Sequence, residues 1–123
     1  MTKQRFSLLL VFATLMGSLF VASCKDDEET TIDCTGVTAT YTADVKPIFD
    51  ASCATAGCHD SNTKAHGLDL STYVGSKEGA INHEVVCSIE QNSGCDPMPE
   101  GGDKLSDAQI KKVRCWIQSG TPQ

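Results

Sequence analysis

The chain has 123 residues, with 10 Lys and Arg against 16 Asp and Glu, so its formal net charge at pH 7 is −6. An acidic surface argues against nucleic-acid binding, because nucleic-acid phosphates require a basic face. The length suits one small domain with short flanking segments.

Residues 1–23 are expected to be a lipoprotein signal peptide. Lys3 and Arg5 give a positively charged start, and the apolar run 6–21 is too short to span a membrane. The run closes on small residues directly before Cys24, which resembles a bacterial lipobox whose cysteine receives a diacylglycerol. The alternative is an ordinary signal peptide that leaves a free thiol at this position.

Residues 24–39 are expected to form a flexible tether. The acidic run 25–29 (KDDEE) predicts a solvated spacer, and it also resembles the signal that sends some Gram-negative lipoproteins to the outer face of the outer membrane. The Thr-rich stretch 30–40 shows no periodicity. We therefore expect a cell-envelope protein, lipid-anchored to the outer membrane and facing either the periplasm or the cell surface.

A chain that begins at Cys24 keeps 8 basic and 16 acidic side chains, a net charge of −8, which is compatible with docking on a basic redox partner. It contains 16 Leu, Ile, Val and Phe in 100 residues. Chains this poor in large apolar residues tend not to fold unaided. A large apolar cofactor or disulfides would supply the missing core.

Residues 40–123 are expected to form an all-α domain of three to five short helices with long loops. The first helix carries a narrow apolar stripe with helical spacing, made of Val45, Ile48, Phe49 and Ser52. It ends at Cys53, and Thr42 or Asp44 is the expected N-cap. After a loop at 66–70, Ser71 or Thr72 is expected to cap a second, weaker helix that Gly75 and Gly79 interrupt.

A third short helix is predicted by apolar residues with helical spacing: Ile81, Val85, Val86 and Ile89. Residues 91–103 have turn composition throughout. The last helix begins at Ser106, with Gln109 completing a capping box and Leu105 paired with Ile110 as a hydrophobic staple. Its expected buried stripe is Ile110, Val113 and Ile117, flanked by Trp116, and Gly120 ends it.

The strongest chemical signal is the run 53–59, in which Cys53 and Cys58 precede His59. Two thiols in this arrangement can add to the vinyl groups of a haem, and the adjacent imidazole then lies beneath the iron as the proximal ligand. The usual motif has two residues between the cysteines, whereas this one has four. Residues 54–57 are small and end in glycine, so a bulge is feasible.

Five segments follow one another in the order of the small c-type cytochrome domains of exported Gram-negative proteins. They are residues 45–49 (VKPIF), 53–59 (CATAGCH), 67–71 (GLDLS), 98–102 (MPEGG) and 105–120. Over about residues 40–121 the chain resembles this family, which is similar in fold to class I cytochrome c. The resemblance implies an N-terminal helix entering the haem motif, a C-terminal helix packed against it, and a distal-ligand loop between them.

The resemblance also implies one covalent haem c. Cys53 and Cys58 would form the thioethers, His59 would be the proximal iron ligand and Met98 the distal one. A thioether suits low-spin iron and raises its potential.

Three alternatives stay open. His66 or His83 would replace Met98 in a bis-His site of lower potential. In a cofactor-free domain descended from a cytochrome, Cys53 and Cys58 would form a disulfide. The same cluster with a further cysteine would accept zinc.

The four remaining cysteines, Cys34, Cys87, Cys95 and Cys115, allow two disulfides in three connectivities. Cys115 falls on the outer face of the last helix, so another segment should cross that face. The segment carrying Cys34 is the natural candidate. Cys87 and Cys95 would then close a short loop before Met98.

The expected function is haem binding and one-electron transfer by a monohaem c-type cytochrome lipoprotein, which is not an enzyme. Its partners would be redox proteins, with a lipid anchor in a membrane, no nucleic acid and no small-molecule substrate. The alternative is a non-haem, disulfide-stapled surface lipoprotein module derived from a cytochrome domain.

Overall fold

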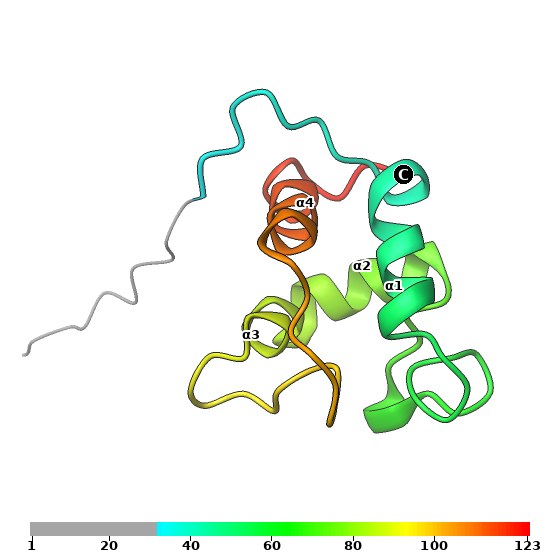
Figure 1. Ribbon diagram of the computed structural model, residues 1–123. Coiled ribbons are helices and arrows are strands. Elements are labelled where there is room, and N and C mark those ends of the chain that lie inside the picture. Colours follow the sequence, from blue (N-terminus) through cyan, green and yellow to red (C-terminus); the bar gives the residue numbers. More distant parts are fainter. Residues whose placement is uncertain (1–31) are drawn as a thin grey trace, which may run out of the picture. The chain divides into compact units, whose positions relative to one another are not determined.

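A computed structural model describes residues 32–123, which form an all-helical unit (Figure 1). The expected signal peptide 1–23, the lipidation residue Cys24 and the first part of the tether lie outside the described residues. The elements in chain order are η1 (Tyr41–Val45), α1 (Lys46–Ser52), η2 (Ala65–Gly67), α2 (Tyr73–Asn82), α3 (Val85–Glu90) and α4 (Asp107–Gln118). Residues 32–123 contain no strand, so the all-α class with short helices and long loops is confirmed.

The first helix starts earlier than its apolar stripe indicated, because a π-helical turn, η1, precedes α1 directly. The expected cap at Thr42 or Asp44 was wrong: Thr40 is the N-cap, and its hydroxyl accepts a hydrogen bond from the Ala43 amide at 3.4 Å. Asp44 lies one turn later, and its carboxylate accepts a hydrogen bond from the Thr40 amide at 3.0 Å. This hydrogen bond, with the ammonium of Lys112 beside it, lowers the pKa of Asp44.

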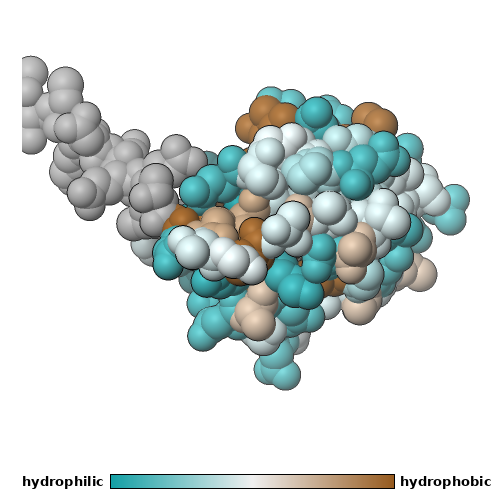
Figure 2. Space-filling model, turned by 90° about the horizontal axis from the view of Figure 1, so that it is seen from above, coloured by the Kyte–Doolittle hydropathy of each residue, from teal (hydrophilic) through white to brown (hydrophobic). Residues whose placement is uncertain are grey.

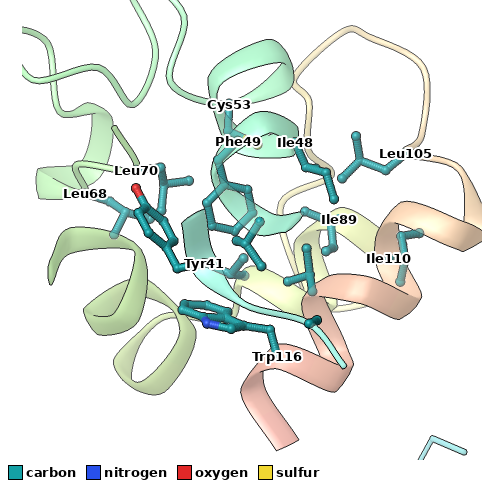
Figure 3. Packing of buried hydrophobic residues seen from close by; sticks show 14 residues of the cluster. Tyr41, Ile48, Phe49, Cys53, Leu68, Leu70, Ile89, Leu105, Ile110 and Trp116 are labelled. Carbon is teal, nitrogen blue, oxygen red and sulfur yellow. The ribbon is translucent and has the colours of Figure 1, made fainter. Parts of the chain in front are cut away.

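The core is built from η1, α1, α3 and α4, with further side chains from the connecting loops (Figure 3). Phe49 and Trp116 are both fully buried, and the indole N–H of Trp116 donates to the Pro122 carbonyl at 2.8 Å. Trp116 is therefore the centre of the buried face of α4, and Ile117, which was expected there, is only half-buried. Ile117 still packs against the core from its half-buried position, so the expected stripe is present, with Trp116 as one of its fully buried members.

The N-terminus of α4 follows the sequence prediction. Ser106 accepts from the Gln109 amide at 3.3 Å, and the Gln109 side chain accepts from the Ser106 amide at 3.0 Å, which completes the capping box. Leu105 and Ile110 on either side of this cap are both buried, as a hydrophobic staple requires.

Two glycines lie inside α2 and do not interrupt it, contrary to expectation. A Cβ at Gly75 would overlap the carbonyl oxygen of Asp69, and one at Gly79 would come within 2.8 Å of Leu68 Cδ1. The glycines therefore let α2 approach the preceding loop closely. The expected cap at Thr72 is confirmed, since its hydroxyl accepts from the Gly75 amide at 3.2 Å.

The apolar spacing from Ile81 to Ile89 crosses a helix boundary. Ile81 belongs to the last turn of α2 and is 63% exposed, whereas α3 begins at Val85 and buries Val85 and Ile89. Among the described residues, only Val74 joins Ile81 as an exposed large apolar side chain. The face drawn in Figure 2 is accordingly mostly hydrophilic, with apolar residues scattered over it.

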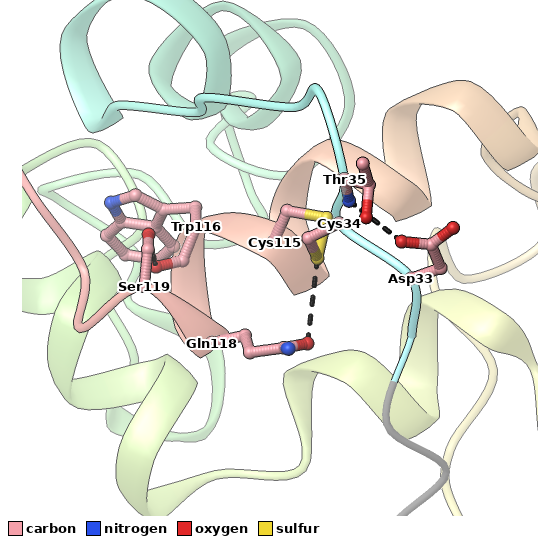
Figure 4. Close-up of a disulfide and its surroundings, with 7 residues drawn as sticks. All are labelled: Asp33, Cys34, Thr35, Cys115, Trp116, Gln118 and Ser119. Carbon is pink, nitrogen blue, oxygen red and sulfur yellow. Dashed lines mark hydrogen bonds between the residues drawn. A yellow bond between two sulfur atoms is a disulfide. The ribbon is translucent and has the colours of Figure 1, made fainter.

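Two disulfides cross-link the domain and join the pairs expected from the sequence. Cys34 is bonded to Cys115 with an S–S distance of 2.11 Å, and Cys87 to Cys95 with 1.99 Å. In Figure 4 the N-terminal arm runs alongside α4 at the first bridge, and Cys115 is consequently only 2% exposed. No helix among residues 32–123 has the length and hydrophobicity needed to cross a membrane.

Candidate cofactor-binding site

A cavity of about 500 Å³ is lined by residues of the loop after α1 and of the loop between α3 and α4. Figure 1 shows these two loops at the same end of the bundle. Its volume falls within the ~300–1,000 Å³ typical of small-molecule and cofactor pockets. The four residues expected to hold haem all line it: Cys53, Cys58, His59 and Met98. The two alternative ligands, His66 and His83, line it as well.

The Cys-His loop is closed by its own backbone. At its start, the Cys53 amide continues the helical pattern of α1 and donates to the Phe49 carbonyl at 2.8 Å. At its end, the His59 amide donates back to the Cys53 carbonyl at 3.1 Å. Gly57 lies between them with φ +87, a conformation that favours glycine. The four-residue spacer thus bulges outward while the two ends of the motif stay together.

The two motif cysteines are free and differ in exposure. Of the six cysteines in the described residues, Cys53 and Cys58 are the two that form no disulfide. Cys53 is buried, and this burial, with the neighbouring Cys58 as a smaller cause, raises its pKa to about 11. Cys58 is exposed at the cavity. Both thiols are therefore available for covalent attachment, one from inside the cavity and one from its edge.

His59 is 8% exposed, and its Nδ1 is buried without a hydrogen-bond partner. Leaving a buried polar atom unpaired costs about 1–3 kcal/mol, so such an atom at a cavity requires an explanation. The backbone around the imidazole is well fixed, because the His59 carbonyl accepts from Leu70 at 2.9 Å and the Cys58 carbonyl accepts from Ala65 at 2.9 Å. A fixed imidazole that is not used by the protein's own hydrogen bonds suits a metal ligand.

Met98 reaches the cavity from the loop between α3 and α4. Its amide donates to the Ser88 carbonyl of α3 at 3.0 Å, and its side chain is half-buried. The Cys87–Cys95 bridge closes the loop just before it. The thioether is thus held by a separate segment from the one that carries His59.

The alternative ligands are less enclosed. His66 and His83 are both exposed, and His66 has a positive φ of 55 in the short turn η2. Residues other than glycine rarely adopt this conformation, and such strain often accompanies functional positions. Both histidines therefore lie in the candidate site, but neither is as buried as His59.

Sequence reasoning did not identify the walls and the rim of the cavity. The walls include the buried side chains Leu68, Leu70, Val85 and Ile89. The rim includes three exposed carboxylates, Glu84, Asp96 and Glu100. The alternating Leu68 and Leu70 were a weak signal for a buried segment. The carboxylates carried no signal, because only the tertiary fold brings residues 84, 96 and 100 to one opening.

Within the described part of the chain, no group of three or more His, Cys, Asp or Glu side chains is placed to hold a metal ion. No family model, curated protein or solved structure matches the chain. The function is therefore inferred from the residues of the cavity.

Proposed function

We propose that this chain is a monohaem c-type cytochrome lipoprotein, which binds one haem covalently and transfers single electrons at the cell envelope. One observation carries the proposal: a single cavity gathers two unpaired thiols, the adjacent imidazole and a thioether from a different loop. These are the donors that covalent attachment and His/Met axial ligation require.

The residues fit the group. Cys53 and Cys58 would hold it through thioethers, while His59 and Met98 would supply a nitrogen and a sulfur ligand to its iron. The His59 imidazole supports this fit, since no hydrogen bond of the protein engages its buried Nδ1 and the ring is free to ligate a metal. When bound, the haem supplies a one-electron iron couple whose potential His/Met ligation raises.

The protein's own contribution is to position these donors and exclude water. Hydrogen bonds from Leu70 and Ala65 fix the backbone of the Cys-His segment, and the bond to Ser88 fixes the backbone of Met98. The buried apolar side chains of the walls would shield a bound group from water, which would strengthen electrostatic interactions around it. Haem attachment and ligation account for the donor groups of the cavity, and we propose an electron carrier that is not an enzyme.

The proposed location is the cell envelope. Two disulfides support a protein that folds in an oxidising compartment. The lipid anchor on Cys24 and the placement at the outer membrane, on the periplasmic or the outer face, rest on the sequence pattern alone.

A second candidate function is a non-haem surface module stapled by disulfides. The long-range Cys34–Cys115 bridge favours it, because a bridge across 81 residues stabilises a small domain without any cofactor. In that case the motif cysteines would be expected to oxidise to each other.

The test is expression of the full chain together with a haem maturation system. We expect a coloured protein with sharp reduced absorption bands and an intact mass raised by one haem. The C53S/C58S double variant should lose all pigment on acid-acetone extraction, whereas the matched C87S/C95S variant should keep it. If the wild-type protein is folded but colourless, with Cys53 and Cys58 joined in a disulfide, the cytochrome proposal is rejected. The second candidate function then remains.

A further inference from the structure

Three exposed carboxylates, Glu84, Asp96 and Glu100, stand at the rim of the cavity. None of them makes an ion pair within the described residues. Glu84 has one close contact, in which its Oε2 lies 3.2 Å from Cys95 Sγ, a disulfide sulfur that neutralises no charge. The rim therefore carries three uncompensated negative charges.

Of the nine other carboxylates in residues 32–123, four are paired with a Lys or Arg side chain. The four ion pairs of residues 32–123 are Lys46–Asp50, Lys64–Asp69, Lys112–Asp44 and Arg114–Glu90. None of these eight residues lines the cavity, and neither does any other Lys or Arg. The cavity opening thus has three carboxylates and no Lys or Arg beside them to offset their charge.

A second, independent observation ties this rim to a ligand. His59 is more than nine-tenths buried, lines the same cavity, and has a ring nitrogen without a hydrogen-bond partner. The rim carboxylates therefore line the same cavity as a buried imidazole that the protein's own hydrogen bonds leave unengaged at Nδ1. If the cavity holds a redox centre, the rim is where that centre comes closest to the surface.

We propose that the rim formed by Glu84, Asp96 and Glu100 is the electron-exchange surface, and that it docks a redox protein with a Lys- and Arg-rich patch around its own centre. This inference rests on the proposed function and adds the class of partner to it. Exposed charges of one sign around an opening attract a complementary surface and orient it, which raises the association rate by about 10- to 1,000-fold. The attraction acts over about one Debye length, ~10 Å at 0.1 M salt, so it must weaken as salt is added.

The experiment measures electron exchange of the haem-loaded full chain by stopped flow. The probes are a lysine-rich soluble cytochrome c and an acidic redox protein of similar size and potential. Both probes are measured at pH 8. We expect the basic probe to react about tenfold faster or more at 10 mM salt, with the advantage disappearing near 0.5 M.

The decisive variant is E84Q/D96N/E100Q, which removes the rim charge with nearly isosteric amides. The matched control D33N/E78Q/D107N removes the same charge from residues that do not line the cavity. The rim variant should lose most of the rate advantage of the basic probe, and the control should keep it. As an independent readout, chemical-shift changes caused by the basic probe should centre on residues 84–100 and vanish in the rim variant.

Two failures are distinguishable. A haem-loaded chain that shows equal rates with both probes, or equal losses in both variants, overturns the docking inference and leaves the proposed function standing. A chain that takes up no haem overturns both.

Discussion

The amide of Met98 donates a hydrogen bond to the carbonyl of Ser88 at 3.0 Å, so the proposed distal ligand is fixed to α3 through its own backbone. The same Ser88 carbonyl accepts from Gln91, where α3 ends. The position of the thioether thus depends on the end of α3 and on the Cys87–Cys95 bridge next to it. His59, in contrast, is placed by the loop after α1.

Met98→Ala should lower the reduction potential of the haem-loaded protein and open the iron to carbon monoxide, because the variant loses the soft sulfur ligand that favours the reduced state. Absorption spectra with and without carbon monoxide, together with redox titration, measure both effects. H66A and H83A serve as matched controls, since these histidines line the same cavity. If Met98→Ala changes nothing while one control does, that histidine is the distal ligand.

The two disulfides should contribute unequally to stability. Their sequence separations are 81 and 8 residues, for which loop-closure entropy gives about 4.5 and about 2.5 kcal/mol. Urea unfolding at equal haem content should therefore show a larger loss for C34S/C115A than for C87S/C95S. The potential should respond in the opposite order, because only the second bridge closes the Met98 loop. A C87S/C95S variant with an unchanged potential would contradict the bracing role.

Burial raises the pKa of Cys53 from an ordinary 9.0 to about 11, which links stability of the haem-free chain to pH. The folded chain holds this proton more tightly than the unfolded chain does. The resulting stabilisation is complete below pH 9 and is lost as pH rises to about 11, by about 3 kcal/mol. Urea unfolding from pH 8 to 11 should show this loss in wild type relative to Cys53→Ala, which lacks the thiol and is otherwise identical. If the free energies of unfolding of the two proteins change in parallel with pH, the link between the Cys53 pKa and stability is ruled out.

The exposure difference between the motif thiols predicts different reactivity before haem attachment. At pH 8, Cys58 should be alkylated by iodoacetamide at least tenfold faster than Cys53, which is both buried and protonated. Timed quenching and peptide mass spectrometry measure the two rates. In 6 M urea the rates should converge, and a difference that persists there would have a local chemical cause unrelated to the fold.

Gly75→Ala should destabilise the domain by about 1–3 kcal/mol, although alanine is the better helix former by about 1 kcal/mol. The added methyl would overlap the Asp69 carbonyl oxygen, so α2 must move away from the loop that lines the cavity. Thermal unfolding compares this variant with Lys77→Ala, an exposed position of the same helix that should change stability by less than about 0.5 kcal/mol. A neutral or stabilising Gly75→Ala would show that this close approach is absent in solution.

Interactions between residues near one another in sequence were predictable. The Ser106–Gln109 capping box and the apolar stripe of α1 depend on spacings of three and four residues, which the helix geometry fixes. The cysteine pairing was accessible for a related reason, since Cys115 on the outer face of a helix required a segment to cross it. The presence of thiols, imidazole and thioether was likewise readable from the chain.

Close packing of a helix against a neighbouring loop was not predictable, even where the two are near one another in sequence. Gly75 and Gly79 look like helix breakers until the loop at 68–70 is seen pressed against them, and Trp116 looks peripheral until the Pro122 carbonyl satisfies its indole. The sequence by itself determined which chemical groups the protein has and which local turns they favour. Only the tertiary structure decided that these groups share one cavity with three unpaired carboxylates at its rim. The physical reason is that packing and charge depend on distances in space, which spacing along the chain does not specify.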